Sequence, residues 1–375
     1  MTSRSSLLLG ARPTTAERAP SRRATRAVIV LIMGAFAGEA GLLGACSSLS
    51  DTLRGCAAFV IGLLAPPTLT AQRLPGTSHG VTKKTVPLTA WGDPDLTGIW
   101  TGSTITPLER PKEFAGKAFL TEQEAAVLEK RALENRADRP PAAGDPGTYN
   151  QIWFDPSSKV VPNRRTSLIV DPPDGLIPFT PEGQSAQTRS RARYGKGPFH
   201  SFLDLDTGER CLTDGMPIYF AGYNNNYQVF QAPGSIVMVH ELYHERRVIS
   251  LDGRPHGRVR QWLGDSRGHW EGQTLVVDTT NFLDKSDAEW QDAWRASRAT
   301  THLVERFTRV DAETIDYQFT WEDPTMFSRP WTAAWPLSNN QASRGVTEGG
   351  VYEYACHEGN YAMEGILSGA RAQER

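Results

Sequence analysis

The sequence has few cysteines and almost no net charge. It contains 4 cysteines among 375 residues and carries a formal net charge of −2. No Cys-x-x-Cys pair and no cysteine–histidine cluster with zinc spacing occurs, which argues against a metal site. The lack of a basic excess argues against nucleic acid as a partner, because nucleic-acid binding needs a basic stripe.

Glycine-rich phosphate loops of the Walker or Rossmann type are also absent. Such loops are the sequence mark of nucleotide and dinucleotide binding. We therefore expect no cofactor. We also expect no Gly-x-Ser-x-Gly nucleophile elbow of a serine hydrolase. These absences leave a small molecule as the expected partner.

Long hydrophobic runs occur only near the N-terminus, and each is short or interrupted. Arginines at 18–26 precede an apolar run at 27–45, which Glu39 interrupts, and a second run spans 57–65. A membrane span needs about 20 apolar residues. A basic segment before an apolar run instead predicts a secretory signal.

We expect residues 1–72 to form this export leader, either cleaved or lipidated. Leu43-Gly44-Ala45-Cys46 is similar to a bacterial lipobox, in which Cys46 would be acylated. In the other version the second run is the apolar region of the signal, with cleavage near Ala71. Both versions predict a periplasmic protein or an outer-membrane lipoprotein, whose lipid anchor would be its membrane contact.

The remaining chain is expected to be a linker at 73–90 and one β-rich domain at 91–372. Helical insertions are expected at 121–139 and 181–193. The first opens with Thr121 and Glu124, the spacing of a capping box. The second opens with a proline at its first position, which suits a helix N-terminus.

Short β-branched and aromatic runs between turn residues dominate the segment 223–282. Strands are also expected at 259–263 and 352–356, and the tail from Gly369 is expected to fray. The pair 301–309 and 314–321 predicts a hairpin. In its second strand apolar and polar residues alternate, which predicts one buried face. The fold class is therefore expected to be mainly β: an antiparallel lipocalin-like barrel, or a curved sheet or sandwich, with short N-terminal helices.

The string His240-Glu241-Leu242-Tyr243-His244 matches the zinc-protease pattern, which requires a helix. Strand-forming residues flank it, so we expect 236–249 to be extended. On a strand the two histidines would stand about 13 Å apart, and Glu241 would point to the other face. We therefore expect no metal here.

Histidines, aromatic residues and amides in the β region are candidates for lining a ligand site. The sequence has 10 tryptophans, which can fill a core or present flat faces to a ligand. The ligand-binding candidates are Asn225, Tyr227, His240, His244, Trp262, Trp270 and Tyr354. They predict binding of a small apolar or aromatic ligand.

An enzyme is the alternative, with hydrolase, isomerase and lyase all open. Its candidates are His256 and His357, with Asp265 and Glu271 as a carboxylate pair on a loop at the barrel mouth. The simpler interpretation is a turn in which Arg267 neutralises both carboxylates. A third possibility is a structural envelope protein with a filled core.

Two cysteines, Cys211 and Cys356, lie in the body of the chain. In an oxidising compartment they are a candidate disulfide. Two buried thiols are the alternative, and the sequence leaves the choice open.

Several long motifs resemble a large family of exported, uncharacterised bacterial proteins. They include RRTSLIVDPPDG (164–175), LDGRPH (251–256), WLGDSRGHWEGQTLVVDTTNF (262–282) and YEYACHEGNY (352–361). The resemblance spans about residues 90 to 372 and implies export and one domain, but no reaction. A shorter likeness, Gly98-Ile99-Trp100, resembles the opening strand of lipocalin-like barrels.

Overall fold

A computed structural model describes residues 86–135, 156–194, 196–197, 199–219, 222–285, 291–357 and 361–374. The chain divides into two units, 1–75 and 76–375, and all described residues belong to the second. The predicted leader and Cys46 lie outside the described residues. Among the helices that the structure describes, none is long and apolar enough to cross a membrane.

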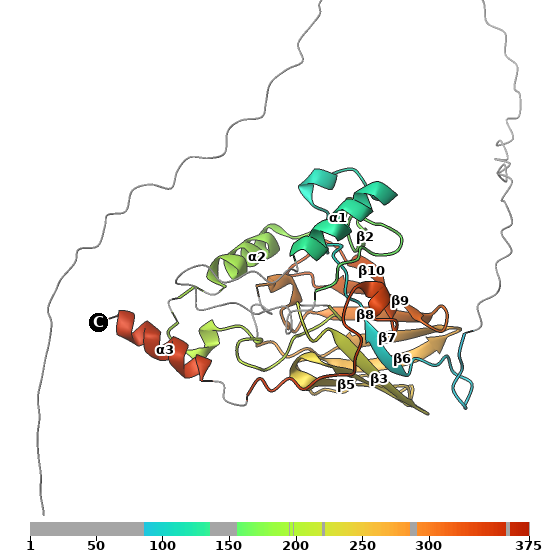
Figure 1. Ribbon diagram of the computed structural model, residues 1–375. Coiled ribbons are helices and arrows are strands. Elements are labelled where there is room, and N and C mark those ends of the chain that lie inside the picture. Colours follow the sequence, from blue (N-terminus) through green and yellow to red (C-terminus); the bar gives the residue numbers. More distant parts are fainter. Residues whose placement is uncertain are drawn as a thin grey trace, which may run out of the picture. The chain divides into compact units, whose positions relative to one another are not determined.

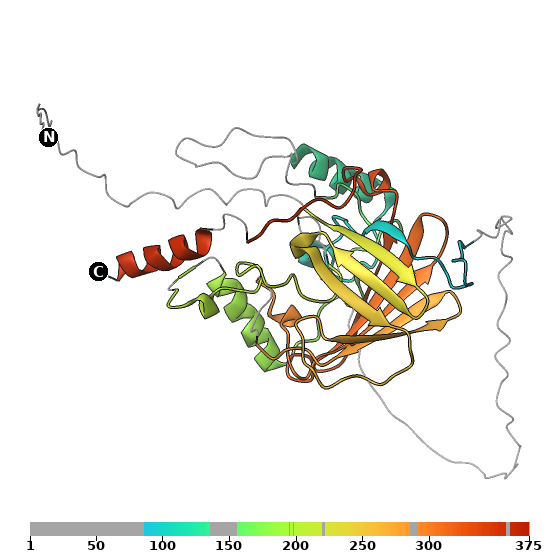
Figure 2. The same ribbon diagram turned by 90° about the horizontal axis from the view of Figure 1, so that it is seen from below.

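The central feature is a closed β-barrel of nine strands (Figures 1 and 2). Its strands are β1 (Gly98–Thr101), β3 (Asn226–Ala232), β4 (Ser235–His240), β5 (Glu245–Ser250), β6 (Asp265–Glu271), β7 (Thr274–Thr280), β8 (His302–Arg309), β9 (Thr314–Glu322) and β10 (Trp331–Ser338). Neighbours pair in that order, and the barrel closes where Thr101 of β1 meets Ser338 of β10. The pairs are antiparallel except for β5 with β6. The short strand β2 (Ile169–Asp171) pairs with β10 outside this ring. The prediction of a mainly β, barrel-type fold is confirmed.

Along the barrel strands, buried residues alternate with more exposed ones, so one face of each strand points into the barrel. The predicted hairpin is β8 and β9, and inward residues of β9 include Tyr317, Phe319 and Trp321. Tyr317 and Phe319 meet Trp331 and Trp335 of β10 in edge-to-face contacts at centroid distances of 5.1 to 5.9 Å. Each such side chain contributes about 2–3 kcal/mol by burial. Aromatic rings therefore fill much of the lumen.

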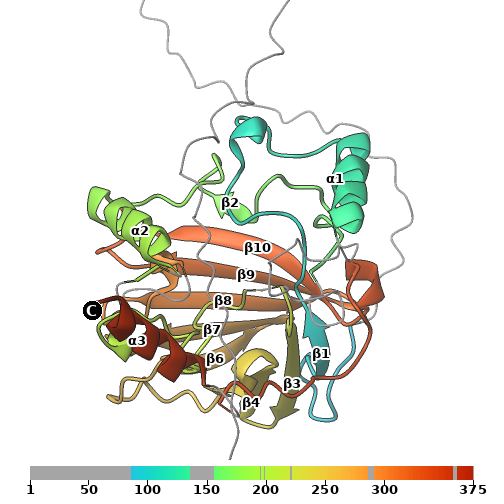
Figure 3. The same ribbon diagram turned by 60° about the vertical axis from the view of Figure 1, so that its left-hand side comes forward.

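Helices lie outside the barrel (Figure 3). They are α1 (Glu122–Asn135), α2 (Pro181–Arg193) and α3 (Ala362–Gln373), with short 3-10 turns η1 (Lys112–Phe114), η2 (Phe202–Asp204), η3 (Leu242–His244), η4 (Ala293–Arg295) and η5 (Ala342–Arg344). The capping box of α1 is present, since the Glu124 amide donates to the Thr121 hydroxyl and the Thr121 amide donates to the Glu124 carboxylate. Helix α2 has the predicted bounds. Residues 136–139 of the first predicted helix lie outside the described part.

Several predicted elements differ from the structure. The expected strand at 236–249 is wrong: β4 and β5 are separated by the turn η3, where Tyr243 and His244 have positive φ angles of 59° and 49°. The expected loop around 265–271 is strand β6, and the expected strand at 259–263 contains only one isolated bridge, at Gln261. Pairing with neighbouring strands decided these cases, because local sequence does not encode it.

The end of the chain also differs. An expected strand at 352–356 is irregular, and the tail, expected to fray from Gly369, forms the last turns of α3. Cys211 and Cys356 form a disulfide, with their Cα atoms 5.7 Å apart. This bond attaches the C-terminal segment to the segment that precedes β3.

Candidate functional site

A pocket at one rim of the barrel is a candidate site. It measures about 510 Å³, within the range typical of small-molecule sites. We call it the rim pocket. Its lining residues are Thr101, Ser103, Asn224, Asn225, Asn226, Glu241, Val346, Thr347, Tyr352 and Glu353. Most of these side chains carry a hydrogen-bonding group.

The floor of the rim pocket comes from the ends of β1 and β3. Thr101 and Asn226 face each other in the strand register, and both turn away from the lumen because their neighbours Trp100 and Tyr227 are buried within it. Asn224 has a φ of 51°, a left-handed conformation that asparagine tolerates better than most residues. The three consecutive asparagines thus form the turn before β3 and also bring side-chain amides to the rim pocket.

The wall opposite comes from the turn between β4 and β5. The Glu241 carboxylate is buried and accepts hydrogen bonds from the amides of Asn226 (3.2 Å) and Tyr352 (2.8 Å). The His244 Nε2 atom accepts from the Tyr354 amide at 3.0 Å. These contacts hold the C-terminal segment over the barrel rim.

The strained residue Tyr243 lies in the same turn. Its hydroxyl donates to the Gly208 carbonyl at 3.1 Å, and its ring meets Tyr354 edge-on at 4.9 Å. Burial, followed by the neighbouring Tyr354, raises the pKa of Tyr243. A positive φ at an aromatic residue persists only where surrounding contacts enforce it, and such residues concentrate at functional sites.

The segment 240–244, which matches the zinc-protease pattern, therefore does not form a zinc-binding helix. His240 points into the barrel, whereas His244 binds the C-terminal segment. The expectation that both histidines lie on one extended strand is wrong, because η3 separates β4 from β5. Among the residues that the structure describes, no group of three or more histidine, cysteine or acidic side chains is arranged to hold a metal ion.

A polar network lies inside the barrel, next to the rim. Arg247 on β5 forms a buried ion pair with Glu305 on β8, and Tyr317 donates to the same carboxylate at 2.9 Å. Arg247 also donates to Ser266 at 2.8 Å and to Thr279 at 2.9 Å. Burial, and then the Glu305 charge, raises the pKa of Tyr317 well above its usual value.

Residues 264–268 do match the Gly-x-Ser-x-Gly string of serine hydrolases. However, Ser266 is buried on strand β6 and bonded to Arg247 and Thr279, rather than exposed on a strand–turn–helix elbow. The position does not suit a nucleophile.

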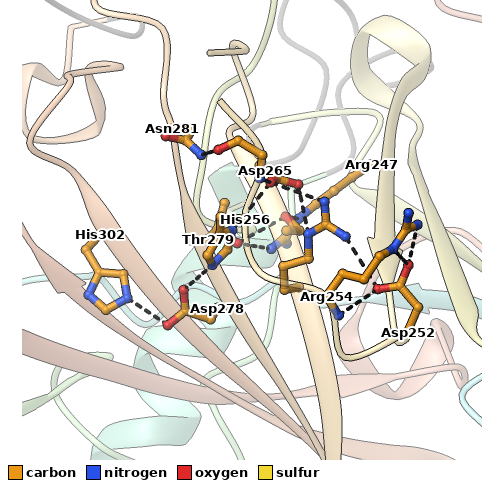
Figure 4. Close-up of polar contacts among 12 residues, drawn as sticks. Arg247, Asp252, Arg254, His256, Asp265, Asp278, Thr279, Asn281 and His302 are labelled. Atoms are coloured by element: carbon orange, nitrogen blue, oxygen red, sulfur yellow. Dashed lines mark hydrogen bonds and ion pairs between the residues drawn. The ribbon is translucent and has the colours of Figure 1, made fainter. Parts of the chain in front are cut away.

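A histidine–aspartate cluster lies on the outer wall, formed by His256, Asp265, Asp278 and His302 (Figure 4). Asp278 lies between the two histidines, 2.8 Å from the Nε2 atom of each. The hydrogen bond with His302 lowers the pKa of Asp278, against partial burial, and the same bond raises the pKa of His302.

Asp265 completes this cluster, 3.5 Å from His256 Nδ1. Its carboxylate accepts from the Gly257 amide at 2.6 Å and pairs with Arg267. Burial raises the pKa of Asp265, but these partners outweigh burial and leave the pKa lowered. The cluster fastens the loop before β6 to strands β7 and β8, and the pockets described here do not include it.

The enzyme candidates are only partly brought together. His256 and Asp265 are neighbours, but Glu271 lies at the other end of β6, where it pairs with Arg306 and His269 rather than with Arg267. His357 is exposed beside Cys356. The expected carboxylate pair of Asp265 and Glu271 is therefore wrong, because strand β6 separates them by about 20 Å.

The ligand-binding candidates also divide. Asn225 lines the rim pocket, while His244 and Tyr354 hold the segment that covers it. Tyr227 and His240 stack inside the barrel, with ring centroids 4.1 Å apart. Trp270 packs against the core from β6, and Trp262 is half-buried on the irregular stretch before that strand.

Sequence reasoning missed several polar residues of these sites. In the rim pocket they include Thr101, Ser103 and Glu241, and inside the barrel Arg247 and Glu305. The sequence offered a signal for Arg247 and Glu305, since each occupies an inward position of an alternating strand. A charge at such a position indicates a buried pair.

Comparisons with known proteins supply no relative: no family model, no curated protein and no solved structure matches this chain.

Proposed function

We propose that this protein binds a small neutral polar molecule, of the size of a sugar or polyol, in the rim pocket. The barrel fold is compatible with a barrel-type ligand-binding protein. The observation that carries the proposal is a hollow of about 510 Å³ lined by amides, hydroxyls and carboxylates. Such groups bind hydroxyl-bearing molecules in both donor and acceptor roles.

The polar lining changes the expected ligand class. The sequence favoured an apolar or aromatic ligand inside the barrel, but aromatic side chains occupy the lumen, and the cavity found there measures about 20 Å³. That volume admits about one water molecule. An apolar ligand of ordinary size therefore does not fit the lumen as it stands.

Charge supports a neutral ligand rather than an anion. The rim pocket includes the carboxylates of Glu241 and Glu353, and none of its lining residues is basic. Like charges in a hollow repel an anionic ligand. The exposed ring of Tyr352 adds an apolar face on which a sugar ring can stack.

The proposal predicts that filling the rim pocket abolishes binding. Thr347→Trp places a large ring in the hollow, whereas Glu348→Trp adds the same ring at the next, non-lining position. Titration calorimetry with a panel of neutral sugars and polyols should show binding by the wild-type protein. We expect affinity to fall at least tenfold in T347W and to change little in E348W.

Two outcomes would contradict the proposal. One is the absence of binding by any member of the panel. The other is equal affinity in T347W and the wild-type protein.

We also propose that the protein is exported, and the N-terminal sequence supports this location. The basic and apolar pattern of residues 1–72 is that of a secretory signal. A disulfide between Cys211 and Cys356 fits an oxidising compartment. Expression of the full chain in a bacterium should yield a shortened protein in the envelope fraction, with Cys46 lipidated or the N-terminus near residue 72. Full-length protein confined to the cytoplasm would contradict export.

The enzyme alternative has no comparable support. Of its candidates, His256 and Asp265 meet on the outer wall, at a place that the pockets described above do not include. Their contacts are explained by the fastening of a loop.

A further inference from the structure

A second site lies inside the barrel, separate from the rim pocket and independent of the proposed function. It is the cavity of about 20 Å³, which we call the inner cavity. His240 from β4 and Arg247 from β5 both line it, together with Tyr227 and the thioethers of Met216 and Met238. In the strand register His240 faces Glu245 and Met238 faces Arg247, so His240 and Arg247 are diagonal neighbours on the inner wall.

Each of these two side chains brings one unpartnered atom to the cavity wall. His240 and Arg247 are only 5% and 7% exposed. The Nε2 atom of His240 and the Nη1 atom of Arg247 are buried and have no hydrogen-bond partner in the described part of the chain. Native proteins rarely leave buried polar atoms in this state, and a bound molecule is the usual remedy.

The other contacts of His240 define what it offers. Its ring stacks on Tyr227, which fixes the plane of the ring, and its Nδ1 atom lies 3.8 Å from the Asp214 carboxylate. A proton is therefore favoured on Nδ1, and the lone pair of Nε2 is left to accept a hydrogen bond. Burial lowers the pKa of His240 to about 4, so the ring is neutral near pH 7.

The charges around the inner cavity are already paired. Arg247 pairs with Glu305, and Asp214 pairs with Arg295 at 3.2 Å. The remaining acid on the wall, Glu245, accepts a hydrogen bond from the Asp214 amide at 3.0 Å. A further ion would have to be buried without an ionic partner, which is strongly unfavourable.

We propose that the inner cavity binds one neutral water-sized molecule that bridges His240 and Arg247. The ligand accepts a hydrogen bond from Arg247 Nη1 and donates one to His240 Nε2. Water has both functions and matches the volume, since about 10–15 Å³ of accessible space suffices for one molecule. The inner cavity is thus a hydration site that completes the buried polar network.

Two measurements on the purified protein test this site. A crystal structure at high resolution should show one ordered water within about 2.7–3.2 Å of both nitrogen atoms. Nitrogen NMR of His240 at pH 7 should show the neutral ring protonated at Nδ1. A dry cavity, or a His240 ring protonated at Nε2 and bonded to a protein group, would overturn the proposal.

A variant pair provides an independent readout in solution. His240→Phe removes the acceptor and fills space, whereas His256→Phe makes the same change on the outer wall. Water-oxygen magnetic relaxation dispersion counts long-lived internal waters, and we expect one fewer in H240F than in the wild-type protein and in H256F. An equal count in H240F and the wild-type protein would refute the bridging role. Should H240F fail to fold, the wild-type structure still decides the matter.

Discussion

At the scale of single residues, buried polar side chains distinguish this barrel from one with a wholly apolar core. His240, Arg247 and Glu305 sit at inward positions that neighbouring strands fill with apolar side chains. Each is costly to bury and is held by specific partners. Of the three, His240 connects the barrel interior to pH through its lowered pKa.

His240 predicts a loss of stability in acid. Its pKa is lowered to about 4 in the folded protein, against about 6.5 in an unfolded chain. The unfolded chain therefore binds the proton first, and the contribution of His240 is present above pH 6.5 and is lost as pH falls towards 4. The difference corresponds to about 3 kcal/mol over this range.

Urea unfolding between pH 4 and 7 measures this effect against His240→Gln, which does not titrate. The free energy of unfolding of the wild-type protein should fall with decreasing pH more steeply than that of H240Q. Parallel pH profiles of the two proteins would exclude the effect.

At the scale of elements, the packing of helix α2 depends on a close contact between Gly183 and the backbone of Met326. Gly183 lies in the first turn of this helix, and a Cβ atom there would come 2.1 Å from the Met326 carbonyl oxygen. The helix N-terminus, capped by Thr180, is thereby held against the segment between β9 and β10. This contact explains the glycine at a helical position.

We expect Gly183→Ala to lower the free energy of unfolding by about 2 kcal/mol, because the helix must move away from Met326. Gly365→Ala in α3 is the matched control, since no atom lies within 4 Å of a Cβ placed there. The control should be neutral or stabilising by less than about 1 kcal/mol. Chemical denaturation of both variants makes the comparison, and equal effects would contradict the docking argument.

Helices and strands were predicted correctly where a local sequence signal marks them. They were predicted wrongly where pairing with a distant strand determines the structure. Helices α1 and α2 carry their own start signals, and the β8–β9 hairpin carries its own alternation. The turn at 241–244 has no glycine or proline to mark it, and it is stabilised by Tyr352, Tyr354 and Gly208, which are remote in sequence. Hence the expected strand at 236–249 was wrong.

At the scale of the whole molecule, the disulfide joins the segment before β3 to the C-terminal segment that lines the rim pocket. Cys211 and Cys356 are separated by 145 residues, and the chain before Cys356 covers the rim pocket. A cross-link over so long a loop restricts the unfolded chain strongly.

Removing this cross-link should weaken the fold. We expect the C211S/C356S variant to lose about 3 kcal/mol in free energy of unfolding. Reductant should produce a similar loss in the wild-type protein and none in the variant, which serves as the control. Equal denaturation midpoints of oxidised wild-type protein and variant would contradict a stabilising role.

Local patterns were enough to predict the β-rich class, two helices and the main hairpin, because periodicity and capping are local properties. Long-range packing was needed to establish three further features: the closure of β1 against β10, the filled lumen, and the gathering of Thr101, Asn225, Glu241 and Glu353 around one hollow. These residues come from four separate stretches of chain. Their proximity depends on barrel closure and on a turn fixed by distant partners, which no local pattern encodes.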